Sequence, residues 1–93
     1  MIIQKLYFIE TCGACPEQYD VFKGGRQVGY VRLRRGTITC DFPDGKGDTI
    51  YSHSFEDGWK GCFDSSEERD TYLNKIATAI HAALKQEKQE SKQ

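Results

Sequence analysis

The chain has 93 residues, of which 38% are hydrophobic, 29% charged and 12% aromatic, so we expect one small folded domain and not a disordered chain. Its net charge of −1 excludes nucleic-acid binding by bulk attraction alone, and no run of about 18 apolar residues predicts a membrane span. Residues 1–5 lack the basic and apolar regions of a signal peptide, so we expect a cytoplasmic protein.

The first half of the chain carries strand patterns. Residues 2–9 have Ile, Leu, Tyr and Phe on both faces, which predicts a strand well covered within a sheet. After a loop that contains a Cys-x-x-Cys sequence, residues 19–23 predict a short strand. The pair Gly24-Gly25 is a strong hairpin signal and would connect that strand to the next one, over residues 27–34.

The second half of the chain begins with two more strand patterns, which a loop then follows. Residues 37–42 and 49–55 predict two further strands, joined by a turn over residues 43–47 that is rich in Pro, Gly and Asp. A loop over residues 56–63 follows and carries the only tryptophan, Trp59. Strands joined by such short turns are antiparallel neighbours.

A helix closes the chain. Ser65 and Glu68 match a capping box, in which a Ser is followed by a Glu three residues later. One apolar stripe follows at helical spacing, formed by Leu73, Ile76, Ala77, Ile80 and Leu84. We expect residues 1–84 to form a single compact domain and residues 85–93, which contain no apolar side chain, to form a disordered polar tail.

These elements together predict an α+β domain with two layers. Its sheet is an antiparallel β-meander of four to five strands, and one C-terminal amphipathic helix packs on one face of that sheet. A domain of this size has little room for an enclosed active site.

Charge is segregated along the chain. Residues 21–36 contain five cations and no acid, whereas residues 37–70 have a net charge of −6. The cations of this basic block are Lys23, Arg26, Arg32, Arg34 and Arg35. If the two blocks adjoin in the fold, the simplest interpretation is mutual neutralisation on a solvated surface.

The basic block also offers a candidate binding site. Alternation places Tyr30, Arg32 and Arg34 on one face of a strand, and Arg26 and Val28 continue that face. Guanidinium groups beside an aromatic ring can contact phosphates, base edges or acidic protein surfaces. We expect this face to bind a macromolecular partner, with a protein as the leading interpretation and nucleic acid as the alternative.

The four cysteines are open to three interpretations. Cys12 and Cys15 form a Cys-x-x-Cys pair that could supply two thiolates to zinc, and Cys40 and Cys62, or His53 in place of one of them, could complete the site. A second paired motif, which makes such patterns specific, is missing. Because a cytoplasmic compartment keeps thiols reduced, the leading interpretation is four structural thiols without a cofactor, and no disulfide framework is expected.

A redox enzyme is the third interpretation. A thioredoxin-like protein would need a helix over residues 16–23, but the segment ends in β-branched and aromatic residues, and residues 27–55 have strand patterns throughout. Neither His53 nor His81 has a nucleophile or carboxylate at a recognisable catalytic spacing. We therefore expect a protein that is not an enzyme.

Two resemblances bear on function. Residues 10–22 and 27–34, and more weakly residues 62–69, resemble small proteins encoded by bacteriophages and prophages. That resemblance implies a bacterial cytoplasm and an accessory role, and it assigns no catalytic residue. Separately, residues 63–73 are similar to the strand-to-helix junction of the arm-type DNA-binding domains of phage integrases, which implies sheet-based DNA binding as a further alternative.

Overall fold

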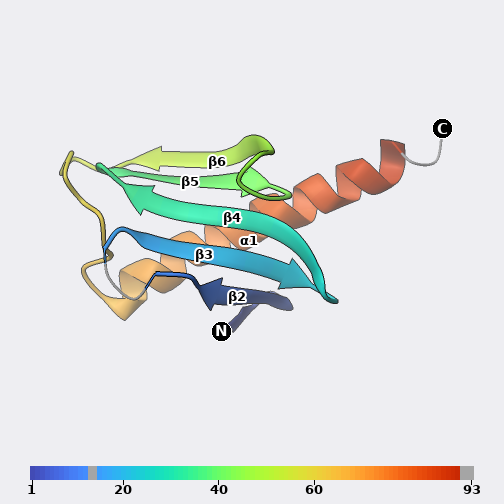
Figure 1. Ribbon diagram of the computed structural model, residues 1–93, viewed down its shortest axis with the longest axis horizontal. Coiled ribbons are helices and arrows are strands. Elements are labelled where there is room, and N and C mark those ends of the chain that lie inside the picture. Colours follow the sequence, from blue (N-terminus) through green and yellow to red (C-terminus); the bar gives the residue numbers. More distant parts are fainter. Residues whose placement is uncertain (13–14, 91–93) are drawn as a thin grey trace.

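The structure is a computed structural model that describes residues 1–12 and 15–90. Its six strands form one antiparallel sheet in which spatial order follows chain order, and one helix packs against the sheet (Figure 1). The elements are β1 (Ile2–Ile3), β2 (Leu6–Glu10), β3 (Glu17–Lys23), β4 (Arg26–Arg34), β5 (Thr37–Phe42), β6 (Asp48–Ser54) and α1 (Ser66–Glu90). The predicted α+β class and antiparallel meander are confirmed, with six strands where four to five were expected.

The extra strand comes from a turn at the N-terminus. Gln4 and Lys5 have φ values of 53° and 67°, the two positive angles that a tight hairpin turn requires. Residues 2–9 therefore form two short paired strands at one edge of the sheet, with Ile3 opposite Leu6. The prediction of one well-covered strand was wrong, because Tyr7 is 49% exposed at this edge.

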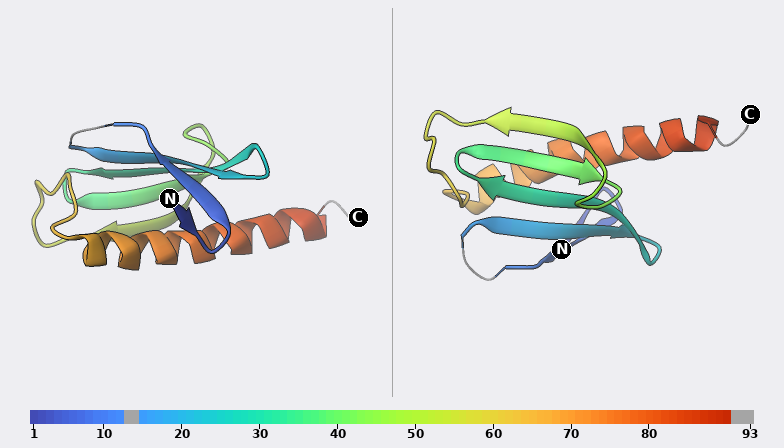
Figure 2. Two further views of the ribbon diagram at one scale, coloured as in Figure 1. Left: turned by 90° about the horizontal axis from the view of Figure 1, so that it is seen from below. Right: turned by 45° about the horizontal axis from the view of Figure 1, so that its top comes forward.

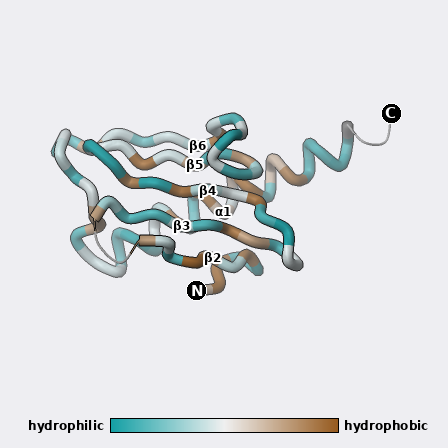
Figure 3. The backbone as a smooth tube through the Cα atoms, in the orientation of Figure 1, coloured by the Kyte–Doolittle hydropathy of each residue, from teal (hydrophilic) through white to brown (hydrophobic). Residues whose placement is uncertain are grey.

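The core lies between the sheet and α1. Figure 2 shows the helix lying across a single face of the sheet, and Figure 3 shows hydrophobic residues interspersed with hydrophilic ones along the strands and the helix. The buried apolar side chains come from β2 to β5 and from the predicted helical stripe: Leu6, Phe8, Tyr19, Val21, Val28, Val31, Leu33, Ile38, Cys40, Leu73, Ile76, Ala77 and Ile80. The opposite face of the sheet is not covered by any element that the structure describes.

Gly29 allows the helix to approach the sheet closely. A Cβ added at this position would lie 2.8 Å from Cδ1 of Ile80 and 3.3 Å from Cβ of Val21. The absence of a side chain on β4 therefore makes room for the helical stripe.

The helix begins as predicted and extends further. The Oγ of Ser65 accepts a hydrogen bond from the backbone N–H of Glu68 at 3.0 Å, as a capping box requires. The helix continues to Glu90, beyond the last apolar residue of the stripe, Leu84. Lys, Gln and Glu have high helix propensity, and Glu87 is anchored by an ion pair with Arg26. Of the tail expected to be disordered, residues 85–90 are thus helical, and residues 91–93 lie outside the described residues.

A register shift in the β3–β4 pair changes which side chains share a face. Val21 pairs with Gly29 but Phe22 pairs with Gln27, so β4 has one extra residue at Val28. Val28 is therefore buried beneath the helix, and Arg26 reaches α1. The expectation that these two residues continue the face of Tyr30 was wrong, because a one-residue shift moves every following side chain to the other face.

Within the described residues, α1 is not apolar enough to qualify as a membrane-spanning helix.

Candidate functional site

The candidate site lies on the sheet face opposite the helix, which we call the open face. In the register, Tyr30 lies between Asp20 and Asp41, and Arg32 lies between Gln18 and Thr39. The alternation of β4 puts Arg34 on the same face. The three residues predicted to bind a partner therefore follow one another along β4, near the middle of the sheet.

The arginines of β4 are joined by a third from the following turn. Arg35 and Gly36 have φ values of 51° and 76° and form the tight turn to β5. Arg32, Arg34, Arg35, Thr37 and Thr39 together line a shallow hollow of about 220 Å³. We call this group of three arginines and two threonines the arginine cluster.

The arginine cluster differs from Arg26 in its ion pairing. Among the described residues, none of its three guanidinium groups has a carboxylate oxygen within 4.0 Å. By contrast, Arg26 forms a bidentate ion pair with Glu87, with hydrogen bonds of 2.7 and 2.9 Å. The structure thus keeps positive charge available at one end of the open face.

The predicted neutralisation between the two charge blocks does not occur through ion pairs of the described residues. Among contacts within the described chain, Arg26 is the only ion-paired arginine of the basic block, and it contacts Glu87, which lies outside the acidic block. Within the acidic block, carboxylates pair with the cations of their own segment, as in the contacts of Lys60 with Asp64 and Glu68 at 2.9 Å.

The other end of the open face is apolar. Tyr7 lies opposite Phe22 on neighbouring strands, and Ile9 lies opposite Asp20. Tyr7 and Ile9 are 49% and 42% exposed, although both are large hydrophobic residues. The open face therefore combines exposed apolar side chains with arginines that form no ion pair among the described residues.

Trp59 lies in a loop beside the arginine cluster. The turn at Gly36 packs directly against this loop, because a Cβ added to Gly36 would lie 2.5 Å from the carbonyl oxygen of Asp57 and 2.7 Å from Cα of Gly58. Trp59 is 88% exposed, the highest value among the large hydrophobic residues of the described chain. Sequence reasoning noted this residue as the only tryptophan but gave it no role.

Several contacts hold the loop of Trp59 in place. The backbone N–H of Gly36 donates to the carbonyl of Lys60 at 2.8 Å, and that of Phe55 donates to the carbonyl of Gly36 at 2.7 Å. The Lys60 side chain is 8% exposed and lies 5.2 Å from the ring of Phe55. These contacts fix the backbone of the loop that carries the exposed indole ring of Trp59.

Glu17 at the start of β3 ties the end of this loop to the sheet. Its backbone N–H donates to the carbonyl of Gly61 at 2.8 Å, and its carboxylate accepts from the N–H of Phe63 at 2.9 Å. The hydroxyl of Tyr19 donates to the second oxygen of the same carboxylate at 2.7 Å. Burial, and then this hydrogen bond, raise the pKa of Tyr19, so the phenol stays protonated and keeps donating.

The cysteines pair differently from the expectation. Cys15 forms a disulfide with Cys62, which joins the loop before β3 to the end of the Trp59 loop with a Cα–Cα distance of 5.4 Å. The expectation that all four thiols are reduced was wrong, and Cys12 and Cys15 do not act as a pair. Gly13 and Ala14, between them, lie outside the described residues. Disulfides are typical of oxidising compartments.

The remaining two thiols occupy different environments. Cys40 is fully buried in the core, where burial raises its thiol pKa to about 12. Cys12 is a half-buried free thiol. In the part of the chain that the structure describes, no three Cys, His, Asp or Glu side chains come together as metal ligands would. The proposed ligand set of Cys12, Cys15, Cys40 and Cys62 is therefore not brought together among these residues.

The two histidines make contacts that hold elements of the fold together. The ring of His53 lies 4.9 Å from that of Phe55 and 5.0 Å from that of Tyr72, in an aromatic cluster between β6 and α1. His81 donates from Nε2 to the carbonyl oxygen of Gln4 at 2.7 Å and so holds the N-terminal turn against the helix.

Comparison of the chain with protein-family models, curated proteins and solved structures finds no match in any of the three.

Proposed function

We propose that this chain is a small non-enzymatic binding module, of the accessory kind that its resemblance to phage-encoded proteins implies, whose open face binds an acidic segment of a protein partner. The observation that carries the proposal is the arginine cluster, in which three guanidinium groups share one hollow and form no ion pair with a carboxylate of the described residues. Unpaired guanidinium groups form strong charge-assisted hydrogen bonds with carboxylates.

The composition of the open face favours a protein over nucleic acid. Asp20 and Asp41 flank Tyr30 in the middle of the face, where they would repel the evenly spaced phosphates of a nucleic acid. A protein segment can instead place its carboxylates at the arginine cluster alone. Tyr7 and Ile9 extend the face with exposed apolar surface, which an amphipathic protein segment can cover.

Trp59 adds an anchor at the arginine end of the face. Trp and Arg are the residue types that most often dominate the energy of protein interfaces. A tryptophan held in a braced loop loses little conformational freedom when a partner covers it, so more of its buried area contributes to affinity.

A binding titration tests the proposal. Isotope-labelled protein is titrated with a peptide that contains several glutamates and two phenylalanines, and with a single-stranded oligonucleotide of the same net charge. We expect the peptide to shift the amide resonances of β4 and β5. The double variant Arg32→Gln plus Arg34→Gln should bind it about 10- to 100-fold more weakly.

The control variant is Arg26→Gln, which removes an arginine of the same strand from the opposite face. It should leave peptide affinity unchanged. Undiminished affinity in the double variant would contradict the proposal. Binding of the oligonucleotide alone, with affinity that falls steeply with salt, would instead support the nucleic-acid alternative.

A further inference from the structure

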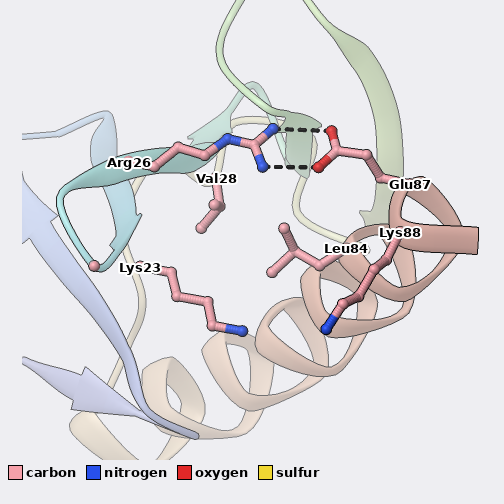
Figure 4. Close-up of a pocket in the computed structure, with 7 residues that line it drawn as sticks. Lys23, Arg26, Val28, Leu84, Glu87 and Lys88 are labelled. Atoms are coloured by element: carbon pink, nitrogen blue, oxygen red, sulfur yellow. Dashed lines mark hydrogen bonds and ion pairs between the residues drawn. The ribbon is translucent and has the colours of Figure 1, made fainter. Parts of the chain in front are cut away.

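A separate pocket lies on the helix side of the sheet, between the β3–β4 hairpin and the last turns of α1. Its volume is about 710 Å³, within the range of roughly 300–1,000 Å³ that small-molecule sites occupy. The residues that line it are Lys23, Gly24, Arg26, Val28, Leu84, Glu87 and Lys88. Figure 4 shows the side chains of the hairpin and the helix facing one another across this space.

The bottom of the pocket is apolar. Val28 projects from β4 and Leu84 from α1, and Figure 4 shows the two side chains directed toward each other. The register shift in the β3–β4 pair puts Val28 on this side. Leu84 lies at the margin of the core and is only partly buried, so its side chain can contact a ligand.

The rim of the pocket is positively charged. Lys23 comes from the hairpin and Lys88 from the helix, and both ammonium groups lie at the same end of the pocket in Figure 4. The Arg26–Glu87 ion pair spans the other end with hydrogen bonds of 2.7 and 2.9 Å. Because that pair is internally neutral, the ammonium group of Lys23 leaves its part of the lining positively charged, which complements an anion.

We propose that this pocket binds a medium-chain aliphatic carboxylate as a free small molecule. The alkyl chain would lie against Leu84 and Val28, and the carboxylate would contact the ammonium group of Lys23 at the rim. A ligand of this kind matches both the apolar bottom of the pocket and the positive charge of Lys23 at its rim. The proposal is independent of the proposed function, because the pocket and the open face lie on opposite faces of the sheet.

The test is a titration of the isotope-labelled full chain with octanoate, octanamide and octylamine, which have the same alkyl chain and different head groups. We expect octanoate to saturate with a dissociation constant on the order of 0.1–1 mM and to shift the amides of Gly24, Val28 and Leu84. Octanamide should bind more weakly, and octylamine more weakly still.

Substitution of the rim lysine separates the carboxylate contact from simple hydrophobic binding. Lys23→Gln should weaken octanoate binding about 3- to 10-fold and leave octanamide binding unchanged. Lys46→Gln is the matched control, since Lys46 is an exposed lysine of the β5–β6 turn that does not line the pocket. Both exchanges are at exposed positions and leave the core intact.

Three results would overturn the proposal: no saturation by octanoate at 10 times the expected constant, equal affinity for octanoate and octanamide, or amide shifts confined to the exposed residues of β2. The Arg32→Gln plus Arg34→Gln variant should bind octanoate as the unaltered chain does. A variant that loses peptide binding but still binds octanoate would show that the two sites are separate. The failure of one proposal can therefore be told apart from the failure of the other.

Discussion

The two ends of the domain are held together in different ways. At one end, the Trp59 loop is fixed by the Cys15–Cys62 disulfide, by hydrogen bonds with Gly36 and by the ion pairs of Lys60. At the other end, the β3–β4 hairpin contacts α1 around an open pocket, and an exposed ion pair, Arg26–Glu87, spans it. The difference shows that one small fold can brace one end with a disulfide and hydrogen bonds, and close the other end with a single exposed ion pair beside a pocket.

The first prediction removes the disulfide from the braced end. It closes a loop with a sequence separation of 47 residues, and constraint of the unfolded chain by such a loop stabilises the fold by about 3–4 kcal/mol. We expect Cys15→Ser plus Cys62→Ser to lower the free energy of unfolding by this amount, measured by urea denaturation without reductant. Cys12→Ser is the control and should cost much less. Equal costs for the two variants would show that the disulfide does not brace this end.

The second prediction compares one glycine from each end. Gly36→Ala places a Cβ against the backbone of Asp57 at a φ of 76°, so it should destabilise the fold by about 2–3 kcal/mol. Gly24→Ala has a similar φ of 57° but meets no atom within 4 Å, so it should cost only about 1 kcal/mol for the backbone conformation. Equal costs, by urea denaturation, would show that the turn does not press against the Trp59 loop.

The sequence predicted the elements whose signals are local. The helical stripe from Leu73 to Leu84 and the capping box at Ser65 follow from periodicity and hydrogen-bonding chemistry within a few residues. The hairpin at Gly24-Gly25 follows from two residues that accept positive φ. The same alternation placed Tyr30, Arg32 and Arg34 on one face.

The features that sequence reasoning missed depend on pairing between distant segments. The alternation of residues within β4 says nothing about how β4 pairs with β3. The register shift that turns Arg26 toward the helix could therefore not be predicted from the sequence. Four cysteines allow several pairings, and only the fold brings Cys15 beside Cys62. The turn at Gln4-Lys5 has no glycine or asparagine to mark it. For Trp59, the sequence offered one signal, a tryptophan within a loop rich in glycine and acidic residues.

The third prediction concerns the looser end. Arg26→Gln should speed amide hydrogen exchange in the last turns of α1 and leave exchange in the Trp59 loop unchanged, because the ion pair that it removes is exposed and local. Exchange that changes equally at both ends would contradict the proposed independence of the two regions.

The contribution of the Arg26–Glu87 ion pair to stability depends on pH, and the lowered pKa of Glu87 sets the direction of that dependence. The hydrogen bond from Arg26 lowers the pKa of Glu87, so the unfolded chain binds the proton more tightly than the folded chain does. The contribution of the pair to stability is therefore present above the pKa of an unfolded glutamate and is lost as pH falls through the lower folded value. Carboxyl titration by NMR should show a lower pKa for Glu87 in the unaltered chain than in Arg26→Gln. An unchanged pKa in that variant would show that the two groups do not pair in solution.

The smallest expected effect on stability, and the most informative for function, is that of Trp59→Ala. The side chain is 88% exposed, so its removal should change the free energy of unfolding by no more than about 0.5 kcal/mol. If the braced loop exists to display this ring, the same variant should bind the glutamate- and phenylalanine-containing peptide about 5- to 30-fold more weakly. Urea denaturation and the peptide titration measure the two quantities on one protein. A large loss of stability would mean that the indole packs against the domain, and unchanged affinity would remove Trp59 from the binding surface. Stability kept and affinity lost would show that the contacts around Gly36, Lys60 and Cys62 hold the ring ready for a partner.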